Sequence, residues 1–95
     1  MSHEKKLQAI TAYLKAEFPE GKIEIKREPA EQIHRFQISR QGPSHFVIVI
    51  EGFLESYAAD QIGTILQDFM VAEHLREMGA TPVVVTPEGL KLEGE

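Results

Sequence analysis

The segment from Phe46 to Thr86 contains two short apolar runs separated by a stretch with helical periodicity. The first run, residues 46–50, reads Phe-Val-Ile-Val-Ile, and the second, residues 82–86, reads Pro-Val-Val-Val-Thr. Runs of this length and composition predict strands. A strand–helix–strand connection makes its two strands parallel if they belong to one sheet. The segment therefore predicts a sheet with at least one parallel pair.

Two stretches of the chain have the apolar periodicity of amphipathic helices. Residues 3–18 are expected to form the first helix, which ends at Pro19. The second is expected to run from Tyr57 to Met78, with Gly79 at its C-terminal cap. The apolar positions are Leu7, Ile10, Leu14 and Phe18 in the first stretch, and Ile62, Ile65, Leu66, Phe69, Met70, Leu75 and Met78 in the second.

The remaining strands are predicted from alternation. Residues 22–28 and 33–40 alternate apolar and polar side chains, which is typical of strands with one face in water. The run 46–50 is apolar on both faces and should be central. We place the strand at 82–86 beside it, which gives the order 1-2-3-4. The rival order, 4-1-2-3, would leave the most apolar strand at an edge, where it would invite pairing with other chains.

These elements fit one domain spanning residues 1–95. The predicted fold is an α+β two-layer sandwich, α-β-β-β-α-β, with a mixed four-stranded sheet and two helices on one face. Residues 41–44 are expected to form a turn because of their glycine and proline. Residues 87–95 have two alternatives, a short fifth strand or a loose tail, since Leu90 and Leu92 alternate with charged residues.

Composition excludes several classes of protein. The chain has no cysteine, which excludes disulfides, thiolate metal sites and cysteine nucleophiles and fits a reducing compartment. It has no apolar run near the roughly 20 residues that span a bilayer, and no apolar secretion-signal core. We expect a cytoplasmic protein with no membrane partner. Its net charge of −5 is uneven: residues 22–50 carry five cations and three acids, whereas residues 51–95 carry two cations and nine acids.

Few residues point to catalysis or to ligand chemistry. His3, His34, His45 and His74 lack the short spacing of metal-binding pairs, so we expect no metal. The glycines form no phosphate-binding loop, so we expect no cofactor. Glu51, at the end of a central strand, is the best catalytic candidate. The sequence supplies no nucleophile or base to accompany it, and we predict that the chain is not an enzyme.

The order helix, three strands, helix over residues 3–78 resembles that of double-stranded-RNA-binding domains. Those domains hold phosphates with a lysine cluster at the start of the second helix. The matching residues 55–61 read Glu-Ser-Tyr-Ala-Ala-Asp-Gln, without a cation. Nucleic-acid affinity depends on cations that neutralise phosphates, so we expect no nucleic-acid partner. The order of elements, the size and the acidity are also similar to those of the small acidic secretion chaperones, which implies a dimeric, protein-binding module.

The central strand, apolar on both sides, needs a cover on each face of the sheet. If Phe46, Ile48 and Ile50 point toward the helices, then Val47 and Val49 point to the other face and form an apolar strip. The alternatives for covering that strip are a partner or the C-terminal residues 87–95 folding back. The predicted interaction face consists of Val47, Val49, Val84, Lys22, Lys26, Arg35 and Gln37.

A contiguous apolar strip on a surface commonly marks an interface. We therefore predict a protein-interaction module whose partner is a second copy of the chain or another protein. A homodimer is favoured because most soluble oligomers are symmetric. The alternative is a module that binds a small or acidic ligand through Lys22, Lys26 and Arg35 on the sheet.

Overall fold

The computed structural model describes residues 4–39, 44–79 and 81–92 of the chain. These residues contain one sheet of five strands, whose spatial order is their order along the chain. The strands are β1 (Lys22–Glu28), β2 (Ile33–Ser39), β3 (His45–Ile50), β4 (Val83–Thr86) and β5 (Gly89–Leu92).

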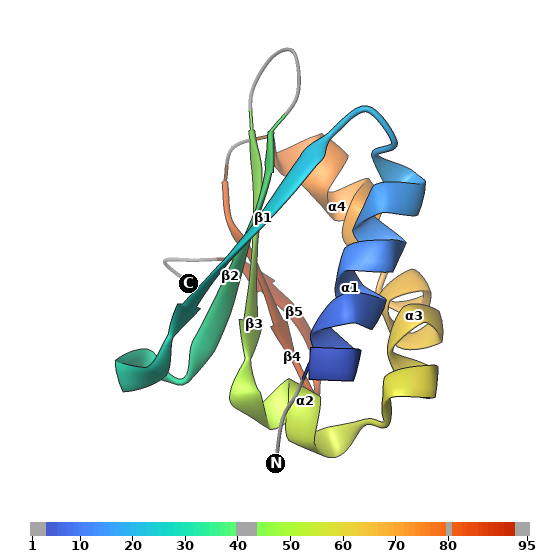
Figure 1. Ribbon diagram of the computed structural model, residues 1–95. Helices are drawn as coiled ribbons and strands as arrows, with labels where there is room; N and C mark the ends of the chain where they lie inside the picture. The colour runs from blue at the N-terminus through green and yellow to red at the C-terminus, as the bar shows by residue number, and fades with distance from the viewer. Residues whose placement is uncertain (1–3, 40–43, 80, 93–95) are drawn as a thin grey trace.

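The helices of the described residues lie to one side of this sheet. Figure 1 shows the long N-terminal helix and the last two helices over one face, and the short second helix at one end of the strands. The predicted α+β class is confirmed, although the sheet has one strand more than expected and the helical residues are divided differently. The helices are α1 (Glu4–Glu17), α2 (Glu51–Ser56), α3 (Ala59–Asp68) and α4 (Val71–Met78), and the 3-10 turn η1 (Pro29–Glu31) joins β1 to β2.

The pairing of the strands makes the sheet mixed. β1 pairs with β2, and β2 with β3, in antiparallel fashion, whereas β4 lies parallel to β3. Val47 is opposite Val83 in that parallel ladder, and Val49 is opposite Val85. The predicted order of the first four strands and their parallel pair are therefore confirmed. The turn expected at residues 41–44 lies outside the described residues, apart from Ser44.

The core lies between the sheet and the helices. On β2 every second side chain is buried, as alternation predicted. The predicted stripe of α1 is also buried, and the chain then turns sharply at Gly21, where a Cβ atom would lie 2.8 Å from Ile38 Cγ2. Only glycine allows β1 to start so close to β2. The largest fully buried side chains are Phe18, Phe36, Phe53, Ile10, Leu14, Ile38, Leu54, Ile62, Leu66, Leu75, His34 and Val47.

The single helix predicted from Tyr57 to Met78 is wrong. α3 and α4 occupy this stretch, and Met70 between them has a left-handed backbone with φ of 57°. α3 packs mainly along α1, whereas α4 packs on β3 and β4. A straight helix could not follow both surfaces, so the chain changes direction at Met70. Gly79 ends α4 as predicted, and its N–H donates to the Leu75 carbonyl at 3.1 Å.

The C-terminal segment forms a strand, which was one of its two predicted alternatives. β5 is antiparallel to β4, and Leu90 is opposite Val85. The Leu90 side chain packs against the core on the helical side of the sheet. Residues 89–92 therefore widen the sheet and do not fold back over its other face. Residues 93–95 lie outside the described residues.

Tyr13 connects α1 to the start of α4. Its side chain is buried, and its hydroxyl oxygen accepts the Ala72 N–H at 3.1 Å. That N–H belongs to the first turn of α4, where the helix itself supplies no acceptor. Burial raises the pKa of the Tyr13 phenol above its usual value of 10.0, because the ionised form would lose its hydration. The nearby carboxylates of Glu73 and Glu17 act in the same direction.

Replacing Tyr13 with Phe should lower the free energy of unfolding by about 1–3 kcal/mol at neutral pH, because a buried N–H loses its acceptor. The raised pKa means that the stabilisation from the protonated phenol is complete below pH 10 and is lost as pH rises through the folded-state pKa. The stability gap between wild type and Tyr13→Phe should therefore shrink above pH 10. Urea unfolding at pH 7 and pH 11 measures both effects, and a gap that widens at pH 11 would contradict the assignment.

Candidate functional site

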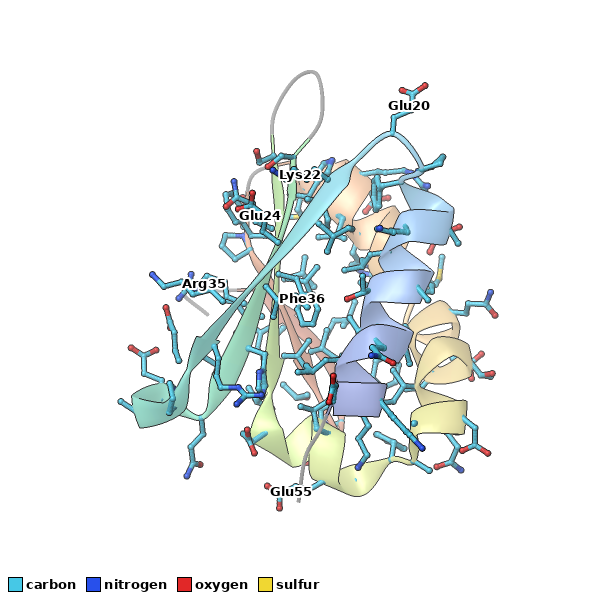
Figure 2. The ribbon with its side chains drawn as sticks, in the orientation of Figure 1. Glu20, Lys22, Glu24, Arg35, Phe36 and Glu55 are labelled. Carbon is cyan, nitrogen blue, oxygen red and sulfur yellow. The ribbon has the colours of Figure 1, made fainter. Side chains whose placement is uncertain are left out.

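One face of the sheet carries no helix of the described part of the chain, and we call it the open face. Figure 2 shows Lys22, Glu24 and Arg35 on this side, whereas Phe36 points toward α1. The register of the strands assigns the other side chains to one face or the other. The open face consists of Lys22, Glu24, Lys26 and Glu28 of β1; Ile33, Arg35, Gln37 and Ser39 of β2; Phe46, Ile48 and Ile50 of β3; Val84 and Thr86 of β4; and Lys91 of β5.

The predicted orientation of β3 is wrong. Val47 is 1% exposed and Val49 is 0% exposed, and both belong to the core under the helices. Phe46 and Ile48 lie on the open face in their place. The other five members of the predicted interaction face do lie together on the open face: Val84, Lys22, Lys26, Arg35 and Gln37.

The orientation of β3 follows from its register with β2. Val47 is opposite Phe36, and β2 alternates clearly enough to show that Phe36 faces the core. Directly opposite residues of an antiparallel pair share a face. The composition of β3 contains no such signal, because both of its sides are apolar. The pairing of β2 with β3, applied residue by residue, is the signal that could have corrected the prediction.

The centre of the open face is an apolar strip formed by Phe46, Ile48 and Val84. Ile48 is opposite Arg35 on β2 and Val84 on β4, and it is only 5% exposed. The Arg35 Nε atom is buried as well, which places the stem of this side chain low over the sheet, as long charged side chains often lie on apolar surface. The guanidinium group of Arg35 extends to Glu28 on β1, the neighbouring strand on the side away from the strip.

The open face is positively charged on an acidic protein. It carries four cations, Lys22, Lys26, Arg35 and Lys91, and two carboxylates, Glu24 and Glu28, whereas the chain has a net charge of −5. Both carboxylates lie near cations of the same face: Lys22 Nζ is 3.6 Å from Glu24 Oε1, and Arg35 Nη2 is 3.4 Å from Glu28 Oε2. The surplus of two positive charges therefore favours an acidic ligand or partner.

The structure brings His34 to Glu51, a pair that the sequence did not reveal. His34 is 1% exposed, and its Nε2 atom is 3.0 Å from Glu51 Oε1 at the start of α2. The Glu51 N–H donates to the Gln32 carbonyl at 2.9 Å, which fixes the chain at this point. A histidine and a carboxylate can exchange protons. The burial of His34 and the helix-initiating position of Glu51 equally suit a pair that joins β2 to α2.

The other described histidines have structural contacts. His45 is buried, its Nδ1 atom is 2.9 Å from the Gly79 carbonyl, and its ring packs against Phe18. His74 Nδ1 lies 2.8 Å from the Met70 carbonyl at the α3–α4 junction. His3 lies outside the described residues. Within the ranges 4–39, 44–79 and 81–92, no group of three or more His, Cys, Asp or Glu side chains is arranged to hold a metal ion.

Every helix in the described ranges is too short or too polar to cross a lipid bilayer. Comparison of the chain with protein-family models, with curated proteins and with solved structures finds no match.

Neighbouring residues of β3 provide a test of its orientation. Val47→Lys should unfold the domain, because it places an ammonium group in the core at a cost of several kcal/mol. Phe46→Lys should change the free energy of unfolding by only about 1 kcal/mol, because the open face can hydrate a lysine. Circular dichroism with urea titration measures both variants. A folded Val47→Lys protein beside an unfolded Phe46→Lys protein would restore the opposite orientation.

The His34–Glu51 pair should be measurable as stability. Glu51→Gln replaces a carboxylate acceptor with a neutral amide, and we expect a loss of about 1 kcal/mol at neutral pH. Glu55→Gln, on the exposed side of the same helix, is the matched control and should be neutral within about 0.5 kcal/mol. Equal thermal midpoints for the two variants would show that the pair contributes nothing to folding.

Proposed function

We propose that this domain is a protein-interaction module that binds a partner protein on its open face. The observation that supports this best is a five-stranded sheet with helices on one face and an apolar strip at the centre of the other. Sheets commonly bury one face of this kind against another layer. Phe46 and Val84 supply apolar area that a partner would remove from water, and their polar neighbours would form the rim.

The chemistry of the open face restricts the partner. Lys26 and Lys91 stand on opposite sides of the strip, on β1 and β5, so positive charge frames an apolar centre. A complementary surface would place an aliphatic or aromatic side chain over Val84 and carboxylates over the two lysines. We therefore favour an acidic protein surface with an apolar centre.

The homodimer expected from the sequence relied on Val47 and Val49, which belong to the core. Two open faces meeting each other would also bring their surplus positive charges together, which is unfavourable. We therefore assign the open face to a different protein. The absence of cysteine fits the reducing compartment that we propose for this binding module, the cytoplasm.

A second candidate function is the binding of a small acidic ligand through Lys22, Lys26 and Arg35. The positive surplus of the open face supports it. Ionic strength separates the two candidates: screening shortens from about 10 Å in 0.1 M salt to about 3 Å in 1 M salt. Binding of a small anion should be largely lost in 1 M salt, whereas binding that depends on Phe46 and Val84 should persist.

The proposal is tested with a face variant and a matched control. Phe46→Lys combined with Val84→Lys adds two charges to the apolar strip, and it should weaken partner capture by at least about 100-fold, as loss of a central apolar contact does. Thr64→Lys with Gln67→Lys adds the same charges on exposed positions of α3 and should leave capture unchanged. A photo-crosslinking residue at position 84 identifies the captured protein. Equal capture by both variants, with both proteins folded, would contradict the proposal.

A further inference from the structure

β1 is an edge strand with an unusual pattern of charge. It pairs with β2 along its whole length, and the described residues supply no strand for its other edge. Its open-face side chains alternate in sign: Lys22, Glu24, Lys26, Glu28. Unpaired strand edges readily pair with other chains, and proteins protect them with charge. A row of lysines would repel a second copy in any register, whereas an alternating row attracts another strand only in a register that places opposite charges against each other.

The alternating row is complementary to itself. In an antiparallel pair of two β1 strands centred on Ile25, Lys22 stands opposite Glu28 of the second copy, and Glu24 opposite Lys26. All four positions of each strand then meet an opposite charge, which stabilises cross-strand pairs. This register also allows backbone hydrogen bonds. Each odd-numbered residue meets an odd-numbered one and each even-numbered residue an even-numbered one, and residues two apart on a strand direct their N–H and C=O groups to the same edge.

The helical side of β1 supports the same axis. Ile25 is 46% exposed, and it is one of two large apolar side chains exposed in the described part of the chain. In the register centred on Ile25, it meets Ile25 of the second copy, so the two side chains cover each other. Ile23 then meets Arg27, whose aliphatic stem can extend along it. An exposed isoleucine in an edge strand thereby gains an apolar neighbour.

α1 carries a second self-complementary pattern over the same point. A groove of about 440 Å³ separates β1 from α1, and Ile25 lines it together with residues of the helix. Small and uncharged side chains, Thr11 and Ala12, lie near the middle of the helical side, with Glu4 toward one end and Lys15 at the other. A two-fold axis at Ile25 sets the two α1 helices antiparallel, so the Glu4 end of one approaches the Lys15 end of the other.

We propose that two copies of this chain form a dimer by antiparallel pairing of their β1 strands, centred on Ile25, with the α1 helices side by side above the junction. The two five-stranded sheets then form one continuous sheet, in an isologous arrangement with two-fold symmetry. Backbone hydrogen bonds across β1 supply affinity, as in other strand additions. The alternating charges select the register.

This proposal goes beyond the proposed function and does not depend on it. Pairing at the β1 edge leaves Phe46 and Val84 on the surface, and the two open faces become neighbours on one side of the joined sheet. The dimer can be absent while the open face still binds a partner, and the reverse also holds. Sedimentation of the purified chain measures dimer formation, and partner capture measures binding by the open face.

Charge reversal tests the register. Lys22→Glu with Lys26→Glu makes the row entirely acidic, and Glu24→Lys with Glu28→Lys makes it entirely basic. Each variant alone should dimerise at least about 100-fold more weakly than wild type, since four attractive pairs become repulsive. An equimolar mixture should form a heterodimer. Glu55→Lys with Asp68→Lys changes the net charge as much as the basic variant does, away from β1, and should remain a homodimer.

A single cysteine tests the axis, because the chain has none of its own. Ile25→Cys places two thiols directly opposite each other, and mild oxidation should link the copies, since facing residues of antiparallel strands come within disulfide range. Arg27→Cys is the control on the same side of the same strand. Its two thiols would lie about 13 Å apart at a rise of about 3.3 Å per residue, so it should stay unlinked.

The outcomes separate clearly. Heterodimer formation by the two charge variants, together with linkage at position 25 and none at position 27, establishes the dimer. A wild-type chain that sediments as a monomer at millimolar concentration overturns it. A wild-type dimer that survives either charge reversal, or that links equally at positions 25 and 27, overturns it as well, because another surface would then hold the copies together. Circular dichroism confirms that each variant is folded.

Discussion

The fold depends on the burial of one face of the sheet beneath α1, α3 and α4. β2 determines which face this is, because its alternation allows only Phe36 and its same-side neighbours to enter the core. The register then orients the adjacent strands: Val47 is opposite Phe36 and Val83 is opposite Val47, so all three side chains face the core. A shift of one residue would exchange the two faces of a strand. One clearly patterned strand thus orients neighbours that carry no pattern of their own.

The same constraint creates the surfaces that are available for binding. Because the helices cover one face, the apolar residues of β3 that do not enter the core collect on the other, where Ile48 is opposite Arg35 of β2. At the β1 edge of the sheet, charge and not apolar area determines which strand can bind. β1 has little apolar content, and its charges decide what can pair with it. An apolar centre and a charged edge are therefore separate binding features of one sheet.

Much of this architecture could be predicted because it depends on local patterns. The stripe of α1, the alternation of β2 and the crossover between β3 and β4 were sufficient for the class, the strand order and the parallel pair. The break at Met70 was missed because an apolar residue in a left-handed conformation continues the helical stripe without interruption. The pairing of His34 with Glu51 was missed because 17 positions separate them, and it is the antiparallel register of β2 with β3 that brings them to 3.0 Å.

The α1 helix, the first four strands with their order, and the alternating charges of residues 22–28 follow from the sequence alone, because they depend on periodicity and on fixed spacing along the chain. Three features depend on contacts between elements: the direction in which Val47 and Val49 point, the pairing of residues 89–92 as a fifth strand, and the position of Ile25 beside α1. A strand that is apolar on both faces has no preferred side to turn toward the core until its register with a neighbouring strand sets one. A short alternating tail likewise needs a neighbouring strand to pair with before it becomes a strand. The side chains of each segment limit which faces can be buried, and the contacts between elements select the face that is buried.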